Sequence, residues 1–285
     1  MRANDQHECV SFSSTADLAR YLRWSPGRRP SILSHRGSPP SDFPENCLPT
    51  YQLAFSAAPC WIEVDIRKSR DGVFVLNHDA RLDRSTTGTG PLSDCTFEQL
   101  RELRLRDLAG NPTAHRIATF EEVMEWARDR TVMFLDIKEG QPAYGEVLSY
   151  VRERDALKFS VTLTYCIEDT LAAYRLAPDS VIYGRATDEE TARELLECGI
   201  PHEQLVAWIN DDTPQDIYDR LHDRGILITY GAFLEADRLA RTEGIGAYTK
   251  WLARGADIIN TDSVPRTAAA IAAFCSERSE SSPQK

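Results

Sequence analysis

The sequence feature that most restricts the fold is a regular alternation, from residue 31 onward, of short apolar segments with amphipathic ones. The apolar segments have the length of strands, and the amphipathic segments have the periodicity of helices. Eight strands that alternate with helices form a parallel (β/α)8 barrel of about 250 residues through right-handed crossovers. We therefore predict an α/β fold, a TIM barrel. Its strands are expected at 32–35, 61–66, 132–137, 160–164, 181–184, 205–209, 226–229 and 256–260.

Two of the expected helices carry start signals. Thr119 and Glu122 have the spacing of a capping box, in which each side chain accepts a hydrogen bond from the backbone amide of the other residue. Pro214 is expected at the first position of a later helix. A backbone N–H at that position has no acceptor within the helix, so proline, which lacks this group, costs no hydrogen bond there. Both signals favour helices at places where the barrel topology requires them.

The chain is expected to hold one domain with short flanking segments. Residues 1–30 are polar and are predicted to be a lead-in with a short helix at 16–22, and the barrel is assigned to 31–275. The segment 276–285 is rich in Ser, Glu and Arg and is predicted to be a flexible tail. The connection after the second strand is longer than one helix needs, which indicates a small insertion at about 68–118.

The insertion has turn and helix signals of its own. It contains a hairpin turn at 70–73, a glycine-rich loop at 86–91, and a short helix capped by Thr96 with Gln99. Because the insertion follows a strand, we expect it at the C-terminal end of the barrel. TIM barrels carry their active sites at that end.

Charge and composition argue against several classes of partner. The net charge of −11 and the pI near 5.1 do not suit a nucleic-acid surface, which needs clustered Lys and Arg. No apolar run approaches the length of a membrane span, so no integral membrane association is expected. The seven cysteines are odd in number and contain no C-x-x-C pair, which favours reduced thiols. We therefore expect a soluble cytoplasmic protein with a small-molecule substrate.

Carboxylates on two predicted strands are candidate metal ligands. Side chains alternate across a strand, so Glu63 and Asp65 share one face, and Asp136 and Lys138 share a face of the strand at 132–137. A buried, unpaired carboxylate loses several kcal/mol of solvation, for which a hard cation such as Mg²⁺ or Ca²⁺ compensates. We predict a divalent metal site at Glu63, Asp65 and Asp136, beside the charge of Lys138. The alternative for Asp136 is a simple ion pair with Lys138.

Two histidines near predicted strand ends are candidate acid and base groups. His35 ends the first strand, and His78 follows a short strand at 73–76. Imidazole titrates near neutral pH, so two histidines that face one reacting atom supply a base and an acid. The neighbouring Arg36 is expected to bind an oxyanion. The alternative for each histidine taken singly is a packed or surface imidazole.

Other polar and aromatic residues are candidates for substrate binding or for supporting the site. Glu45 is expected to orient Arg36 or to bind substrate. Asn46 is expected to bind substrate, to support the site, or to cap the helix that follows it. Recognition of a leaving group is expected from the insertion and the later loops, although aromatic residues are more often part of a core. The aromatic candidates are Trp208, Tyr230, Phe233 and Trp251.

Together these residues resemble the glycerophosphodiester phosphodiesterase family in type, order and spacing over residues 31 to about 265. Asp262 closes the last matching block and is expected either to contact substrate or to cap the following helix. The matching blocks are His35-Arg-Gly37, Pro44-Glu-Asn46, Glu63-Val-Asp65, His78-Asp79 with Leu82-Asp-Arg-Ser-Thr86, Leu135-Asp-Ile-Lys138, and Gly255-Ala-Asp-Ile-Ile-Asn-Thr-Asp262.

The resemblance implies a metal-dependent (β/α)8 hydrolase that splits a glycerol phosphodiester into glycerol phosphate and an alcohol. In the family's scheme the glycerol 2-hydroxyl attacks phosphorus with the help of one histidine and the metal, while the other histidine protonates the leaving alcohol. Water then opens the cyclic intermediate. The implied roles are metal binding for Glu63, Asp65 and Asp136, acid and base catalysis for His35 and His78, and phosphate neutralisation for Arg36 and Lys138.

One departure from the family pattern concerns the ion. Asp136 stands where many relatives have Glu, and the shorter side chain favours Mg²⁺ with retained water over a fuller Ca²⁺ shell, so both ions stay candidates. The alternatives are a related phosphodiesterase for a sugar phosphodiester or a lysophospholipid, and a barrel that binds phosphorylated ligands without catalysis. A nucleotide site is disfavoured because no Walker or dinucleotide glycine loop is present.

Overall fold

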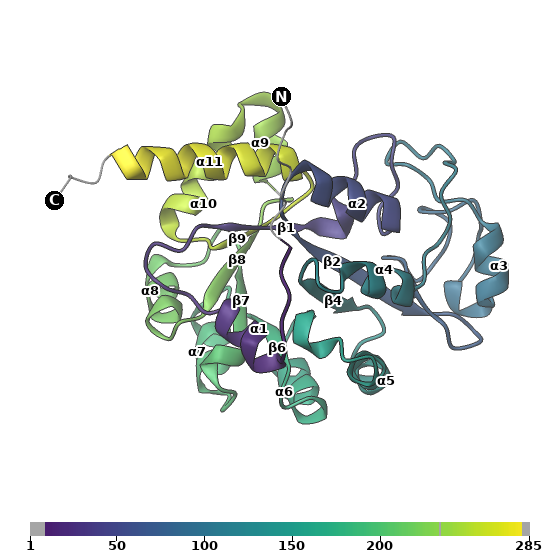
Figure 1. Ribbon diagram of the computed structural model, residues 1–285, viewed down its shortest axis with the longest axis horizontal. Coiled ribbons are helices and arrows are strands. Elements are labelled where there is room, and N and C mark those ends of the chain that lie inside the picture. The colour runs from purple at the N-terminus through teal and green to yellow at the C-terminus, as the bar shows by residue number, and fades with distance from the viewer. Residues whose placement is uncertain (1–8, 234, 281–285) are drawn as a thin grey trace.

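Eight parallel strands close into a barrel in the computed structural model, which describes residues 9–233 and 235–280 (Figure 1). The barrel is closed because β1 pairs with both β2 and β9. All eight predicted strands are confirmed, with ends that differ from prediction by at most two residues. They are β1 Ser31–Ser34, β2 Trp61–Lys68, β4 Met133–Ile137, β5 Ser160–Leu163, β6 Val181–Arg185, β7 Leu205–Ile209, β8 Leu227–Gly231 and β9 Ile258–Thr261.

Helices between successive strands form the outer layer around the barrel (Figure 1). The capping box predicted at Thr119 and Glu122 is present at the start of α4. Pro214 lies one position earlier than predicted, as the residue that precedes α8. The outer helices are α2 Leu48–Ala57, α4 Phe120–Ala127, α5 Gln141–Glu153, α6 Ile167–Leu176, α7 Glu189–Glu197, α8 Gln215–Asp223, α9 Ala236–Thr242, α10 Thr249–Arg254 and α11 Val264–Glu280.

The alternation of side chains along β2 and β4 separates an inner face from an outer one. The strand register pairs Asp65 with Asp136, so the two carboxylates lie on the same face of the sheet. Val64 and Leu135 form a second pair on the opposite face and are fully buried beneath the helices. The carboxylate face is therefore the barrel lumen, as the sequence pattern predicts.

The insertion after β2 is a small folded unit at the rim of the barrel. Its strand β3, Phe74–Leu76, runs antiparallel to the end of β2, and its helix α3, Phe97–Glu102, begins with the predicted capping box at Thr96 and Gln99. The unit packs around its own apolar cluster, and α3 lies far from the barrel axis in Figure 1. This cluster comprises Cys47, Val75, Leu82, Leu92, Leu100, Leu105 and Ile117. The pairing of β3 with β2 brings His78, the second residue after β3, toward the barrel mouth.

The lead-in closes the N-terminal end of the barrel. The predicted helix is present as α1, Thr15–Tyr21, with Leu18 and Leu22 buried. It contacts the short turns 157–159 and 202–204, which lead directly into β5 and β7. The lead-in is therefore part of the barrel core rather than an appendage.

At the C-terminus the helix extends further than predicted. A flexible tail was expected from residue 276, but α11 continues through 276–280, and 281–285 lie outside the described residues. All seven cysteines lie in the described part of the chain and are free thiols. None of the helices within 9–233 and 235–280 has the length and apolar character needed to cross a membrane.

Candidate active site

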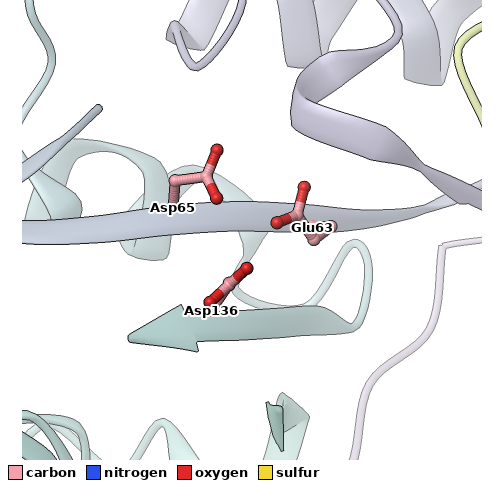
Figure 2. A group of neighbouring side chains, drawn as sticks. All are labelled: Glu63, Asp65 and Asp136. Atoms are coloured by element: carbon pink, nitrogen blue, oxygen red, sulfur yellow. The ribbon is translucent and has the colours of Figure 1, made fainter. Parts of the chain in front are cut away.

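Three carboxylates meet in the lumen, where Glu63 and Asp65 lie on β2 and Asp136 lies near the C-terminal end of β4 (Figure 2). Glu63, Asp65 and Asp136 each offer an oxygen atom, and these atoms all lie within 4.8 Å of one another. The three residues are at most 3% exposed. The strand pattern alone predicted this set, because the register of two adjacent strands places their inward carboxylates side by side.

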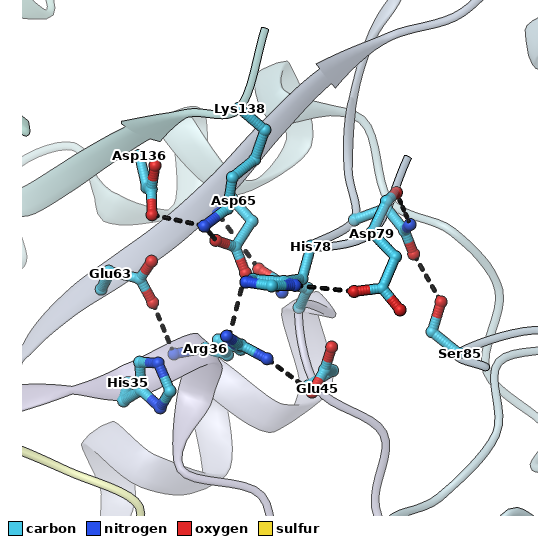
Figure 3. Close-up of polar contacts among 12 residues, drawn as sticks. His35, Arg36, Glu45, Glu63, Asp65, His78, Asp79, Ser85, Asp136 and Lys138 are labelled. Atoms are coloured by element: carbon cyan, nitrogen blue, oxygen red, sulfur yellow. Dashed lines mark hydrogen bonds and ion pairs between the residues drawn. The ribbon is translucent and has the colours of Figure 1, made fainter. Parts of the chain in front are cut away.

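Two cations partly neutralise this cluster. Lys138 Nζ lies 2.8 Å from Asp65 Oδ1 and 2.5 Å from Asp136 Oδ2, and Arg36 Nε lies 3.4 Å from Asp65 Oδ2 (Figure 3). Burial raises the pKa of Asp65, but Lys138 and Arg36 outweigh burial and bring this pKa below its ordinary value. The Asp136–Lys138 contact predicted as an alternative to metal binding thus exists within the carboxylate cluster.

Glu63 is the carboxylate with the least compensation. Burial, followed by the charges of Asp65 and Asp136, raises the pKa of Glu63 well above its usual range. Its Oε2 accepts one hydrogen bond of 2.9 Å from the backbone N–H of Arg36. A positive charge placed beside Glu63 would counter this shift and favour its ionised form.

The carboxylate oxygens fit a hard divalent cation. Asp136 Oδ1 is buried and has no hydrogen-bond partner among the described residues, which leaves an acceptor free for a cation. A set made only of carboxylate oxygens suits Mg²⁺ or Ca²⁺ better than a soft transition metal. Glu63, Asp65 and Asp136 are therefore the residues that could hold a metal.

A tight turn after β1 presents His35 and Arg36. Arg36 adopts a left-handed backbone conformation with φ of 50°, which is uncommon for a residue with a side chain. Gly37 has φ of 93°, and a Cβ atom there would lie 2.8 Å from Thr50 Cγ2. Only glycine fits this position without displacing α2. The turn thus accounts for the His-Arg-Gly order seen in the sequence.

His35 is held between an acidic and an aromatic side chain. Its Nδ1 lies 2.8 Å from Asp262 Oδ1, and its ring stacks on Phe233 with a centroid distance of 4.0 Å. Asp262 is held in turn through its backbone N–H, which donates to Asp237 Oδ2 at 2.6 Å. A carboxylate at Nδ1 favours the tautomer that leaves Nε2 free for proton transfer.

His78 is held by the insertion in a similar way. Its Nδ1 lies 2.7 Å from Asp79 Oδ1, and Arg67 donates two hydrogen bonds to the His78 carbonyl. Arg84 binds both carboxylate oxygens of Asp79, and this pairing lowers the Asp79 pKa far below its usual range. In Figure 3 Arg36 lies between the two histidines. The site therefore contains two imidazoles with one carboxylate partner each.

Glu45 and Asn46 support the cluster from the loop before α2. Glu45 contacts Arg36 Nη1 at 3.4 Å and Arg84 Nη2 at 2.6 Å. It therefore links Arg36, beside the carboxylate cluster, to Arg84 of the insertion. Asn46 Nδ2 donates to Asp65 Oδ2 at 2.6 Å, while its Oδ1 accepts from the Asp65 N–H at 3.2 Å. The predicted helix cap at Asn46 is wrong, because Cys47 occupies the N-cap position of α2. Asn46 instead orients a candidate metal ligand.

Sequence reasoning missed Tyr165, which follows β5 at the barrel mouth. Its hydroxyl donates a hydrogen bond to Asp136 Oδ2, and its ring packs edge to face against Trp208 at 6.3 Å. Arg185 lies over the Trp208 ring at 5.8 Å. The signal that could have found Tyr165 is the two-residue period of β5, which continues past Leu163 on the inner face.

Two aromatic candidates lie away from the site. Tyr230 and Trp251 are 1% and 2% exposed and stack on each other at 4.4 Å between β8 and α10. The register pairs Tyr230 with Ile209 and Ile259, on the face that packs against the helices. The expectation that Tyr230 and Trp251 contact substrate is therefore wrong, and both belong to the core. Of the four aromatic candidates, Trp208 and Phe233 lie at the site.

Comparison with known proteins agrees with the geometry of the candidate active site. The model of the glycerophosphoryl diester phosphodiesterase family matches residues 35–189, which contain both histidines and all three carboxylates. Glycerophosphodiester phosphodiesterase 1 of Bos taurus is 38% identical over 120 residues, and the glycerophosphodiester phosphodiesterase of Caldanaerobacter subterraneus is 32% identical over 115 residues. The matches cover 40% of this chain, and 35% and 47% of those two proteins respectively.

Solved structures match over most of the chain. A glycerophosphoryl diester phosphodiesterase from Parabacteroides distasonis has a TM-score of 0.87 and 29% identity, and the match covers 93% of this chain and 94% of that one. An Oleispira antarctica phosphodiesterase, solved in complex with the product sn-glycerol-3-phosphate, has a TM-score of 0.68 over 86% of this chain and 97% of its own. The two proteins are 20% identical, so this match shows only that they share a fold.

Proposed function

We propose, since this chain belongs to the glycerophosphoryl diester phosphodiesterase family, that it hydrolyses a glycerophosphodiester to glycerol phosphate and an alcohol. The observation that carries the proposal is a buried three-carboxylate cluster with two imidazoles at the same barrel mouth. The glycerol phosphate product bound to the Oleispira antarctica phosphodiesterase supports the same product here. The proposal concerns a phosphoric diester hydrolase whose substrate is a small phosphodiester.

The cluster of Glu63, Asp65 and Asp136 would hold a divalent cation. When bound, the cation supplies positive charge that stabilises phosphate oxygens and lowers the pKa of an attacking hydroxyl. We favour Mg²⁺ over Ca²⁺, because the short side chain of Asp136 suits a small ion that keeps part of its water shell. A bound cation would favour the ionised form of Glu63, against the burial and neighbouring carboxylates that raise its pKa.

Arg36 and Lys138 would bind the phosphate group. Both lie at the edge of the cluster with partly exposed side chains, and both are already oriented by Asp65. Cations that are fixed before the reaction stabilise the charge that develops on phosphate oxygens without reorganising. Phosphoryl transfer depends mainly on such positioning and charge stabilisation.

His35 and His78 would move the protons. One imidazole takes the proton of the glycerol 2-hydroxyl as its oxygen attacks phosphorus, and the other donates a proton to the leaving alcohol. Water then opens the cyclic phosphate and restores both protonation states. Asp262 and Asp79 would keep each imidazole in the tautomer that these steps need.

The leaving alcohol would lie against the exposed rim formed by Tyr165, Trp208 and Arg185. Tyr165 is about half exposed and touches the cluster through Asp136, so a group bound there would be adjacent to the phosphate.

We also propose that the protein is cytoplasmic. Its seven cysteines are free thiols, as is usual in a reducing compartment.

The test is to measure release of glycerol 3-phosphate from a panel of glycerophosphodiesters. The protein is stripped with EDTA and then given Mg²⁺, Ca²⁺ or Mn²⁺ in separate assays. We expect release only with a metal, fastest with Mg²⁺, and none from a matched His35→Ala preparation, which controls for contaminating hydrolases.

Three outcomes separate the alternatives. Cleavage of sugar or lysophospholipid diesters in place of simple ones would keep the chemistry and change the substrate class. Saturable phosphodiester binding without turnover under any metal would support a barrel that binds without catalysis. Metal-independent release by the wild type, above the level of the His35→Ala preparation, would overturn the proposed metal-dependent mechanism.

A further inference from the structure

A cavity lies at the N-terminal end of the barrel, opposite the end that holds the carboxylate cluster. It has a volume of about 540 Å³ and opens where Ser31 begins β1, Trp61 begins β2 and Thr131 precedes β4. Its volume is in the range of about 300–1,000 Å³ that small-molecule sites occupy. Because catalysis in TIM barrels takes place at the other end, this cavity has no part in the proposed hydrolysis.

Three arginines line the cavity, and its described lining contains no carboxylate. Arg28, Arg29 and Arg130 form no ion pair within 4.0 Å among the residues that the structure describes. The chain as a whole has 44 acidic and 33 basic residues, so most of its cations have acidic neighbours available. A concentration of positive charge without a direct ion-pair partner in a concave site attracts anions.

Two of these arginines are oriented by groups that leave their charge unbalanced. Arg28 Nη1 donates to the Tyr21 carbonyl at 2.7 Å, whereas its buried Nε has no hydrogen-bond partner within the described chain. Arg130 donates to the Trp126 carbonyl and lies over the Trp126 ring. Burial lowers the pKa of Arg28, while Tyr21 and the more distant carboxylate of Asp257 act in the opposite direction. Carbonyls and aromatic faces therefore fix these cations in advance of any anion.

Apolar side chains form much of the remaining wall of the cavity. Ile32, Trp61 and Ile271 contribute side chains that are at most 6% exposed. A site with cations on one side and an apolar surface on the other suits a ligand with a charged head and an apolar body. Inorganic phosphate alone would leave the apolar wall uncovered.

We propose that this cavity binds a small organic anion with one phosphate or carboxylate head and an apolar body. The head lies against Arg28, Arg29 and Arg130, and the body lies against Trp61 and Ile271. This site is separate from the proposed catalytic function and does not depend on it.

The test uses octyl phosphate as the probe and isothermal titration calorimetry of the full chain in EDTA. We expect saturable binding at one site, with at least tenfold weaker binding of inorganic phosphate and of octyl glucoside, which lack the body and the charge respectively. The double variant Arg29→Gln with Arg130→Gln should bind octyl phosphate at least tenfold more weakly. Arg36→Gln should bind it like the wild type, because Arg36 belongs to the catalytic mouth.

A matched pair of variants on α11 tests the cavity itself. Ala268 lines the cavity, whereas its neighbour Ala269 is exposed and does not. Ala268→Phe should abolish binding by filling the space while keeping all three arginines, and Ala269→Phe should leave binding unchanged. The proposal is overturned if no saturable binding occurs, if Arg36→Gln alone removes it, or if Ala268→Phe binds like the wild type. Thermal melting of each variant checks that it is folded.

Discussion

The two halves of the active site are held in different ways. The barrel half consists of Glu63, Asp65 and Asp136 on β2 and β4, where burial leaves each charge dependent on its neighbours. The insertion half centres on His78, whose side chain is 32% exposed and whose partner Asp79 is paired with the half-exposed Arg84. Charges buried together are strongly coupled, whereas water screens exposed ones. Substitutions in the barrel half should therefore affect both stability and activity, and those in the insertion mainly activity.

The largest effect should come from Asp65→Asn. Asp65 pairs with Lys138 and Arg36 and accepts a hydrogen bond from Asn46, so its charge is shared by three partners. We expect loss of metal binding and at least about 10³-fold lower turnover, since a bound metal contributes several kcal/mol to the transition state. Unfolding of the metal-free protein should become easier by about 3 kcal/mol, because two buried cations lose their counter-charge.

Titration calorimetry with Mg²⁺ and urea unfolding in EDTA measure these effects. Asp83→Asn is the matched control, since Asp83 lies on the exposed side of the insertion and pairs with Arg81. An Asp65→Asn protein with metal-supported turnover within tenfold of the wild type would contradict the assignment of Asp65.

The next effect compares the two histidines. His35→Ala and His78→Ala should each lower turnover by about 10²–10⁴-fold, the usual contribution of general acid or base catalysis. An aryl phosphodiester with p-nitrophenol as leaving group needs no proton donor, so the variant that lacks the acid should recover most of its rate on this substrate. Steady-state kinetics on alkyl and aryl diesters measure the difference. Recovery in both variants or in neither would show that the histidines do not divide the two roles.

The contrast between the halves also decides how much the sequence could predict. Strand alternation was sufficient for the metal cluster, because Glu63, Asp65 and Asp136 need only their own strands and the register between them. The place of His78 was predicted from its position after a hairpin strand. The contact of Arg84 with Asp79, the carboxylate partner of His78, was not predicted, because a loop contact across several residues has no periodic signal.

The aromatic candidates show where sequence reasoning failed. Tyr230 is one residue away from the inward-facing Thr229, and this single step places it under the helices instead of at the mouth. Asn46 was predicted as a substrate ligand, a supporting residue or a helix cap, and only its left-handed backbone with φ of 55° turns its amide toward Asp65. The face on which Tyr230 lies depends on the strand register, and the direction of the Asn46 amide depends on a loop conformation. Composition and spacing specify neither.

The carboxylate partners of the histidines should have a smaller effect than the histidines themselves. Asp262→Asn and Asp79→Asn should each lower turnover about tenfold, since residues that orient a catalytic group usually contribute about 10–100-fold. Asp262 should show the larger loss, because Arg84 partly offsets the Asp79 charge and so weakens the effect of Asp79 on His78. Turnover measured against pH should shift for both variants while the substrate KM stays within about threefold. An unchanged pH profile in both would assign these carboxylates a purely structural role.

The smallest effect should come from Arg84→Gln, which removes the ion pairs of the half-exposed Arg84 with Asp79 and Glu45. Arg84 keeps the Asp79 pKa low, so in the wild type this pair stabilises the fold above the unfolded pKa of Asp, near 3.9, and the contribution is lost as the pH falls through the lower folded value. Because Arg84 is half exposed, the change in unfolding free energy at pH 7 should stay below about 1 kcal/mol. Urea unfolding of both proteins from pH 7 into the acid range should show a constant difference above about pH 4, with the two curves converging only below it. A loss of several kcal/mol at pH 7 would show instead that the insertion is held as tightly as the barrel, and the distinction between the two halves would fail.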